Sequence, residues 1–406
     1  MRRLAPALLL LLAGWGAILW LPPFSNDSVS DLFVFRGFAD AVLDGEIPYR
    51  DVFLEYPPLA TPAIALPGVF GGGESGFRAA YAGWTLLLAA AVVVLCGALA
   101  ARTGGSRRRA LLAAAAMPFL CGALLRTHFD LAPVAITLVA LLLLVDERPR
   151  LGLAVLGVAV MTKGFPIVVA PVALAWLAAR AGRRVALQAS AALLATVAVV
   201  ATAAVIASPD GTWDALTYQV DRPVQVESAP AGLLYALDGL GLGEAVGVES
   251  HRSDGLEHPL AGTLSALLVA TMFGVVALLS VQAALRPHDS RALVLASLAA
   301  ILAFACLGRI LSPQFIIWTI PLGALALAWR HHALALAVAV AAVLTQVEFP
   351  AHYFDVVDRE PLALAVVCLR DATLIAALAL AVRALEVRGQ EDLLHRRGEA
   401  VGAGVH

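Results

Sequence analysis

Charged residues are scarce in this sequence of 406 residues: they make up 14% of it, against roughly 25% in an ordinary soluble domain. Hydrophobic residues make up 61%, and the mean hydropathy is +0.86. This apolar character extends over the whole length, which excludes a soluble protein and also a soluble domain on a single anchor. The sequence therefore predicts a polytopic membrane protein.

Lysine and cysteine are also rare, and familiar catalytic motifs are missing. Lys163 is the only lysine, and the four cysteines lie in or beside apolar stretches without paired spacing, so they are interpreted as packing residues. The sequence contains no phosphate loop, dinucleotide fingerprint, HExxH or GxSxG motif, and no clear internal repeat. The enzyme classes that depend on those motifs are therefore not indicated.

What the sequence has instead is a series of apolar runs that predicts about twelve transmembrane helices. The runs cover residues 4–22, 77–101, 110–125, 131–145, 151–162, 166–179, 185–207, 260–284, 292–308, 314–329, 333–348 and 362–384. The first run ends without an A-x-A cleavage site, so it is interpreted as a span and not as a signal peptide. The two short runs beside Lys163 are compatible with a single broken element.

The distribution of charge gives an orientation, because Lys and Arg gather in short cytoplasmic loops. Placing alternate loops inside puts 18 of the 28 basic residues in the cytoplasm and 22 of the 30 acidic residues outside. Both termini are then cytoplasmic, and two long outer loops span residues 23–76 and 208–259. We expect a single transmembrane domain over residues 1–384, with a partly disordered cytoplasmic tail at 385–406.

The first outer loop carries its own periodic pattern. Apolar residues recur at helical spacing within residues 30–43, which predicts an amphipathic helix at the outer interface that presents Asp31 and Arg36. Residues 59–70 are too short and too rich in proline for a confident span, so we expect a partly inserted segment.

Polar clusters stand at the outer ends of spans. In chain order they are Asp31 in its helix, Pro48-Tyr49, Glu55-Tyr56-Pro57-Pro58-Leu59, Phe129-Asp130, Lys163 before Pro166, Arg222-Pro-Val-Gln225-Val-Glu227-Ser228, and Ser312-Pro313-Gln314-Phe315-Ile-Ile-Trp318. These residues, in this order and spacing, resemble glycosyltransferase family 87. The family contains mannosyltransferases that depend on polyprenol-phosphate-mannose. The resemblance implies an all-α, GT-C-like bundle and transfer of a hexose, with inversion, from a polyprenyl-phosphate donor to a lipid or glycan acceptor at the outer face of the cell membrane.

Such a reaction needs a base and cations. A sugar phosphate already has a good leaving group, so one carboxylate has to accept the proton of the acceptor hydroxyl while cations hold the phosphate charge. The resemblance makes Asp31 the base; the alternative is that Asp31 caps its helix. The residues assigned to the donor phosphate are Lys163, Arg126, Arg222 and Arg309.

Each assignment of a cation has a structural alternative. Lys163 could be a snorkelling side chain at the outer interface, although ionisable residues at membrane depth are usually functional. Arg126 could pair with Asp130, Arg222 with Glu227, and Arg309 with lipid head groups. The residues assigned to sugar or acceptor contacts are Glu55, Tyr56, His128, Asp130, Gln225, Glu227 and Gln314.

Other readings stay open on the sequence. Glu55 could simply pair with Arg50, and Arg370-Asp371 inside the last run is interpreted as a neutralising pair facing the bundle. No compact DxD stands in the outer loops, so no metal and no cofactor beyond the lipid-linked co-substrate is expected.

The competing functions are a lipid or solute transporter and an assembly subunit without activity. The charged clusters at the outer ends of the spans favour the enzyme. No nucleic-acid partner is expected.

Overall fold

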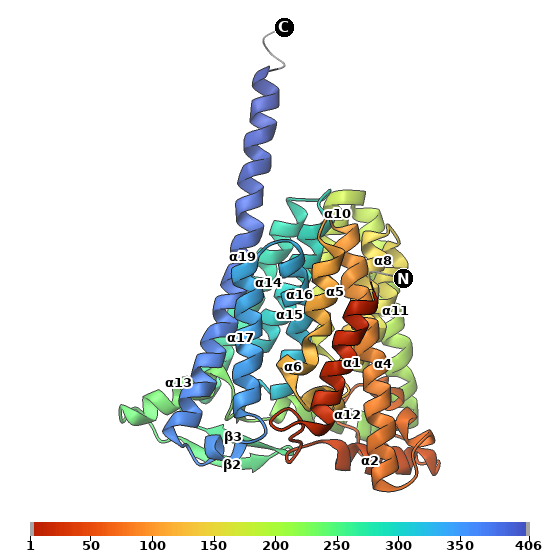
Figure 1. Cartoon of the computed structure of the whole chain (residues 1–406), viewed down its shortest axis with the longest axis vertical. Helices are drawn as coiled ribbons and strands as arrows, with labels where there is room; N and C mark the ends of the chain where they lie inside the picture. The colour runs from red at the N-terminus through yellow and green to blue at the C-terminus, as the bar shows by residue number, and fades with distance from the viewer. Residues whose placement is uncertain (1–3, 403–406) are drawn as a thin grey trace.

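A computed structural model describes residues 4–402, with side chains described as far as Glu386. The chain forms a helical bundle whose longest connections gather at one end (Figure 1). In chain order the elements are α1 (Ala5–Trp20), α2 (Leu32–Leu43), α3 (Ala60–Ala65), η1 (Leu66–Val69), α4 (Gly73–Arg102), α5 (Arg107–Ala115), α6 (Met117–Cys121), α7 (Leu124–Thr127), α8 (Leu131–Val145), α9 (Pro149–Thr162), η2 (Phe165–Val168), α10 (Val169–Ala181), α11 (Arg183–Ala207), α12 (Pro209–Asp221), β1 (Val224–Gln225), α13 (Ala229–Gly239), β2 (Val246–Ser250), β3 (Ser253–Glu257), α14 (Ala261–Ala284), α15 (Ser290–Cys306), η3 (Pro313–Phe315), α16 (Ile316–Ala328), α17 (His332–Glu348), α18 (Tyr353–Val357) and α19 (Pro361–Gly402).

The predicted apolar runs all fall on helices. Within the described part of the chain, four helical stretches are long and apolar enough to cross a membrane: α4, α11, α14 and Pro361–Glu386 of α19. The other apolar helices of the bundle have between 10 and 17 residues. The structure therefore supports a membrane protein, while the number of twelve spans and the cytoplasmic placement of the termini stay predictions.

The centre of the bundle is formed by α15 and α16. Almost every side chain of these two helices is buried, from Ala292 to Cys306 and from Ile316 to Ala328. A helix that is apolar on all sides has to be surrounded by other helices or by lipid. Here α10, α14 and α19 pack around α15, whereas α5 and α17 pack on α16.

The first long connection, which joins α1 to α4, contains the predicted interfacial helix. α2 buries Leu32, Phe35 and Phe38 against α3 and η1 and leaves Phe33 exposed, as the periodic pattern indicates. The short helices α3 and η1 occupy the segment predicted to be short and broken. The helix covers residues 32–43 of the predicted 30–43, and its place at the outer interface stays a prediction.

Three details differ from the expectations. The second long connection contains a small antiparallel sheet in the order β1-β3-β2, so the chain is not purely α-helical. The run at 110–125 is divided into α5, α6 and α7. The segment around Lys163 is not a single element, because the chain reverses there between α9 and α10. The reversal is seen in that the start of α9 and the end of α10 line the same pocket, at the end of the bundle opposite Lys163.

At the far end of the chain, α19 projects beyond the bundle, away from the long connections (Figure 1). Side chains after Glu386 and residues after Gly402 lie outside the described part of the structure. The domain boundary at residue 384 and the disorder of the tail therefore stay predictions.

Candidate active site

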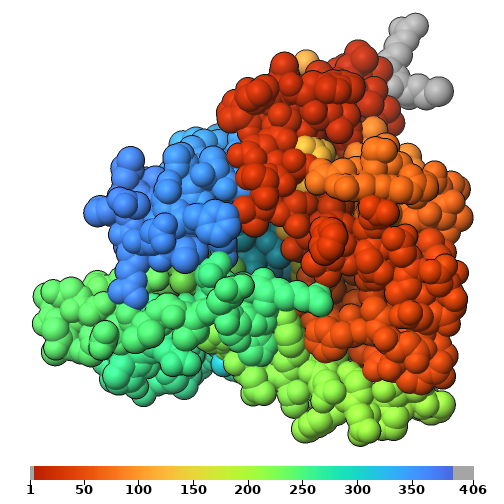
Figure 2. Space-filling model, turned by 90° about the horizontal axis from the view of Figure 1, so that it is seen from below, coloured from red at the N-terminus to blue at the C-terminus, as the bar shows by residue number. Residues whose placement is uncertain are grey.

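Asp31 lies immediately before α2, at the end of the bundle that carries the long connections. Its side chain is 39% exposed and makes no capping hydrogen bond; the hydroxyl of Ser30 accepts the N–H of Leu32 instead. The capping interpretation of Asp31 is therefore wrong. Viewed from this end, the molecule has a hollow between the first connection in red, the second in green and a blue segment near the C-terminus (Figure 2).

His128 faces Asp31 from the break between α7 and α8. Its Nε2 lies 3.4 Å from Asp31 Oδ2, and its Nδ1 lies 3.3 Å from the carbonyl oxygen of Leu124. Nδ1 also lies 2.9 Å from the Thr127 hydroxyl, so the ring is held on the side away from Asp31. His128 is buried and Asp31 is not, which leaves the outer side of the carboxylate open.

Lys163 and Asp130 form a buried ion pair. The ammonium Nζ lies 2.7 Å from Asp130 Oδ1, and the indole N–H of Trp318 donates to the same oxygen at 2.5 Å. Both side chains are at most 10% exposed, so Lys163 is not a snorkelling residue. The proposed pairing of Arg126 with Asp130 is also wrong, because Lys163 takes that place.

Four aromatic rings surround the Lys163 ammonium. The distances from Nζ to the ring centroids are 4.8 Å for Phe129, 5.4 Å for Tyr56, 5.5 Å for Trp318 and 6.0 Å for Phe315. Rings at this range stabilise a cation through their negative faces. Nothing in the sequence pattern singled out Phe129, Phe315 and Trp318 as ligands of a cation, although all three stand in the quoted motifs.

The segment around Tyr56 connects α2 to this ion pair. The Tyr49 hydroxyl donates to the carbonyl oxygen of Tyr56 at 2.6 Å, and the Leu59 N–H donates to the carbonyl oxygen of Met161 at 2.8 Å, which ties the segment to the end of α9. The Tyr56 ring packs edge-on against Phe129 with centroids 4.8 Å apart. These contacts hold Tyr56 over Lys163.

Glu55 is a second carboxyl group that interacts electrostatically with Asp31 and Arg222. Burial raises its pKa, Arg222 opposes that shift, and the neighbouring Asp31 adds to it. Glu55 does not pair with Arg50, because Arg50 binds Asp51 at 2.8 Å. Arg252, which sequence reasoning missed, also acts on Glu55 and comes from the turn between β2 and β3.

Arg222 and Arg309 line a large groove beside α14. The groove has a volume of about 1030 Å³ and includes Val269 and other small or apolar residues on one flank of α14, together with the side chains of Asp221, Glu244, Glu257 and His258. Arg222 donates to the Ser253 hydroxyl at 3.2 Å and does not pair with Glu227. Arg309 donates to the backbone carbonyls of Gln219 and Val220. The structure thus brings these two predicted cations together.

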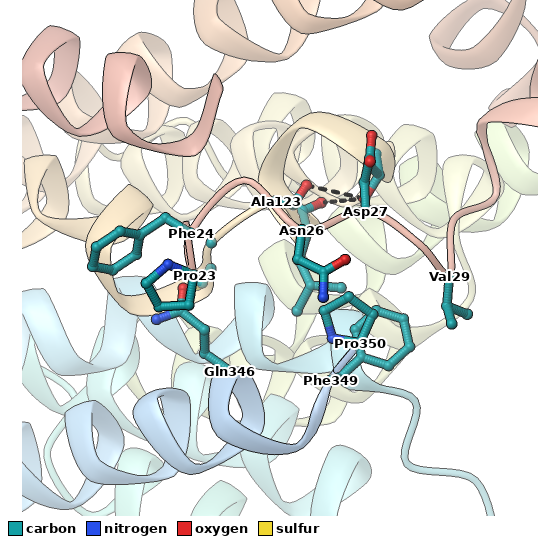
Figure 3. A pocket seen from close by; sticks show the side chains of 13 residues that line it. Pro23, Phe24, Asn26, Asp27, Val29, Ala123, Gln346, Phe349 and Pro350 are labelled. Carbon is teal, nitrogen blue, oxygen red and sulfur yellow. Dashed lines mark hydrogen bonds between the residues drawn. The ribbon is translucent and has the colours of Figure 1, made fainter. Parts of the chain in front are cut away.

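Arg126 lies elsewhere, and each of its three guanidinium nitrogens has a partner. It donates to Asp27 at 2.9 Å and to the carbonyl oxygens of Ile18 and Ser25 at 2.9 and 2.8 Å. Asp27 borders a narrow pocket in which residues of the first connection face Gln346, Phe349 and Pro350 (Figure 3). Arg126 thus fastens the first connection to α1 and α7.

Glu227 belongs to a buried charge cluster, defined here as Glu227, Glu348, Arg370 and Asp371, and Gln225 contacts it. The guanidinium of Arg370 binds Asp371 at 3.0 Å and lies 3.5 Å from Glu348, and it donates to the carbonyl oxygen of Glu227. Burial raises the pKa of the Glu227 carboxyl group well above its usual range. The expected Arg370-Asp371 pair is confirmed, but its contacts with Glu227 and Glu348 were not predicted.

This cluster is connected to the start of α16. The Gln225 amide donates to Glu227 Oε2 at 2.9 Å, and the Ser312 hydroxyl donates to Gln225 Oε1 at 3.0 Å. Gln314 follows in η3, half-buried, next to the Phe315 ring that lies over Lys163. Gln225 and Glu227 are fully buried, whereas Gln314 and Glu55 are only half-buried.

Metal ligands do not gather at this site. Among the described residues, no three His, Cys, Asp or Glu side chains are arranged to hold a metal ion. The expectation that no metal is required stays a prediction.

Comparison with known proteins gives the family to which the chain belongs. The model of glycosyltransferase family 87 matches residues 53–313, well over half of the chain. Helices of membrane length with polar groups gathered at one end describe an integral membrane protein. The chain belongs to glycosyltransferase family 87, and four of its described helical stretches are long and apolar enough to cross a membrane. Asp31 lies before the matched range.

Two solved structures are similar to this chain. They are the Archaeoglobus fulgidus oligosaccharyltransferase tethered with an acceptor peptide containing the NVT sequon and the same enzyme in the apo form. Both are 15% identical and cover 94% of this chain, with TM-scores of 0.44 and 0.45. The match covers 55% and 56% of their own length, so this chain spans a little over half of them. A search of curated proteins finds no match.

Proposed function

We propose that this protein transfers mannose from polyprenyl phosphomannose to a lipid or glycan acceptor at the outer face of the membrane, with Asp31 as the base. The observation that supports this most strongly is the state of Asp31: a carboxylate without a capping bond, 39% exposed, and held from one side by His128. A base needs an open lone pair within reach of the acceptor hydroxyl. Asp31 meets that requirement, whereas Asp130 is buried in its ion pair.

The reaction balances without an acid. Asp31 removes the proton of the acceptor hydroxyl, the acceptor oxygen forms a bond to the anomeric carbon, and the bond from that carbon to the phosphate oxygen breaks. The polyprenyl phosphate leaves with one more negative charge than it had as a diester. Because attack and departure take place on opposite sides of the carbon, the configuration is inverted.

Cations are needed where this charge develops. Arg222 and Arg309 line one groove, and Arg222 also lies close to Glu55. Lys163 has three N–H donors, of which Asp130 takes one, and its charge lies at the inner end of the site. We leave Arg126 out of this set, because all three of its guanidinium nitrogens bind Asp27 or the backbone carbonyls of Ile18 and Ser25 and so hold it against α1 and the first connection.

The groove beside α14 suits the donor lipid. Its wall includes Ala261, Gly262, Ala266 and Val269, which lie along one flank of α14, a helix long enough to cross a membrane. An isoprenoid chain lying against this flank would bring its phosphate to the two arginines. Glu55, Tyr56, His128 and Gln314 remain the proposed contacts to sugar or acceptor.

The test is transfer of radiolabelled mannose from polyprenyl phosphomannose into lipid and polymer fractions, with membranes that contain the wild type or Asp31→Asn at equal protein level. We expect a labelled product from the wild type and its loss in the variant. If the wild type gives no product with this donor but does with a polyprenyl phosphoarabinose, the mannose assignment is wrong. If neither donor is used, the lipid-phosphate donor itself is wrong.

A further inference from the structure

Another pocket, besides the groove and the narrow pocket described above, lies at the end of the bundle opposite the candidate active site. α8 starts beside Asp130, and the turn that follows its last residue, Val145, is therefore at the far end. The pocket has a volume of about 460 Å³. Its lining comes from the ends of α8 to α11 and from the connection between α14 and α15, and includes Leu144, Glu147, Trp176, Arg180, Val185 and His288.

Trp176, which lines the pocket, carries a hydrogen-bond donor without a partner in the described part of the chain. Trp176 is 1% exposed, and its indole N–H has no partner among the described residues. A buried donor without a partner is costly, and such groups usually bind a ligand or water. The guanidinium of Arg180 lies over the same ring, 5.0 Å from the centroid.

Arg180 retains donors for a ligand as well. Its Nη2 donates to Glu147 Oε1 at 2.6 Å and its Nη1 to the carbonyl oxygen of Pro287 at 3.0 Å. A guanidinium has five N–H donors, so these bonds do not exhaust it. The Glu147 side chain is 73% exposed, and an ion pair this accessible to water is weak and easily exchanged.

Basic residues outnumber acidic ones in the chain segments next to the pocket lining. The chain positions within two residues of its lining carry more cations than acids; the cations are Arg148, Arg150, Arg183, Arg184 and Arg286, and the acids are Asp146 and Asp289. The arginine bias predicts that this end faces the cytoplasm. Basic pockets between membrane helices on that side favour anionic lipid head groups, and Trp and Arg are typical of the membrane interface.

We propose that this pocket binds the phosphate group of an anionic phospholipid in the leaflet opposite the candidate active site. The phosphate oxygens accept hydrogen bonds from the Trp176 indole and the Arg180 guanidinium, and the acyl chains follow the apolar wall of Leu144, Leu177 and Val185. The site is separate from the proposed donor groove, and it does not depend on the proposed function.

The experiment is native mass spectrometry of the purified full chain, titrated with phosphatidylglycerol, with phosphatidylcholine or with inorganic phosphate. We expect the wild type to bind one phosphatidylglycerol more tightly than phosphatidylcholine. Arg180→Gln should weaken that binding about tenfold, because a charge-assisted bond is lost. Arg108→Gln is the matched control, since Arg108 is exposed at the same end of the bundle and does not line the pocket.

Trp176→Phe keeps the aromatic ring and removes only the N–H, so it should weaken binding by roughly threefold while the protein stays folded. This variant keeps the test valid if Arg180→Gln does not fold. Equal weakening by Arg108→Gln and Arg180→Gln, or equal affinity for the two lipids, would overturn the proposal. Binding of inorganic phosphate as tight as that of phosphatidylglycerol would show a soluble anion site and overturn the lipid assignment.

Discussion

Asp27 and Asp31 stand four residues apart in the same connection, yet their surroundings differ. The Asp27 carboxylate accepts from Arg78 at 2.7 Å and from Arg126 at 2.9 Å. Among the residues that the structure describes, Asp31 has only His128 as an ionic partner, at 3.4 Å, and more of its side chain is exposed. Both guanidinium groups bind the same oxygen of Asp27, Oδ2, and tie this aspartate to α4 and α7, so the difference in pairing separates a structural aspartate from a more available one.

The largest expected effect concerns Asp31. Asp31→Asn keeps the size of the side chain and removes the proton acceptor, so the transfer rate should fall roughly 10²–10⁴-fold, as for loss of a general base. Donor binding should change little. The measurement is single-turnover transfer in purified protein together with donor affinity, and a variant that loses donor binding as well as transfer would argue against the role of a base.

A third aspartate, Asp130, extends the comparison to a buried ion pair. Lys163→Met would leave the Asp130 carboxylate buried without its cation, which should cost about 3–5 kcal/mol of stability. Thermal unfolding in detergent measures this change. The double variant Lys163→Met with Asp130→Asn should recover most of the lost stability but not the transfer activity. Full recovery of transfer would mean that Lys163 has no part in the reaction.

Asp27→Asn should produce the opposite pattern from Asp31→Asn. It weakens two ion pairs that fasten the first connection, which should lower stability by about 1–3 kcal/mol. Transfer per folded molecule should stay within a few-fold of wild type. Thermal unfolding and specific activity of the folded fraction measure both effects; a large loss of specific activity at full stability would remove the distinction between the two aspartates.

The smallest effect is expected for Glu55 and depends on pH. Burial raises its folded-state pKa above the ordinary value of 4.5, so its contribution to stability is complete below that value and is lost as the pH rises through the folded-state pKa. Glu55→Gln should therefore flatten the decline of the unfolding temperature above pH 4.5. The exposed Glu46→Gln serves as the control, and equal curves for wild type and Glu55→Gln would contradict the assignment.

Much of the helical framework could be predicted because long apolar runs and the periodicity of α2 are strong signals. The sheet could not. β1 has only two residues, and the turn between β2 and β3 is formed by His251 and Arg252 with positive φ, without the Gly or Asn that normally indicate such a turn.

For the site, the sequence indicated most of the residue types but not their partners. Arg126 and Asp130 are four apart, which suggests a helical pair, but His128 between them has an extended backbone that ends α7 before α8 begins. Asp130 instead meets Lys163, 33 positions away, and Arg126 meets Asp27, 99 positions away. The first pairing depends on how α8 packs on α9, and the second on how the first connection lies against α7. The spacing of residues in the sequence indicates neither arrangement.

The most direct test of the central claim compares Asp31→Asn with Asp27→Asn in one assay. Transfer of mannose from polyprenyl phosphomannose is measured for both variants and divided by the amount of folded protein. We predict that Asp31→Asn loses at least roughly 10²-fold in transfer per folded molecule, whereas Asp27→Asn loses stability and keeps its specific activity. Equal specific activity of Asp31→Asn and wild type would contradict the claim that Asp31 is the base.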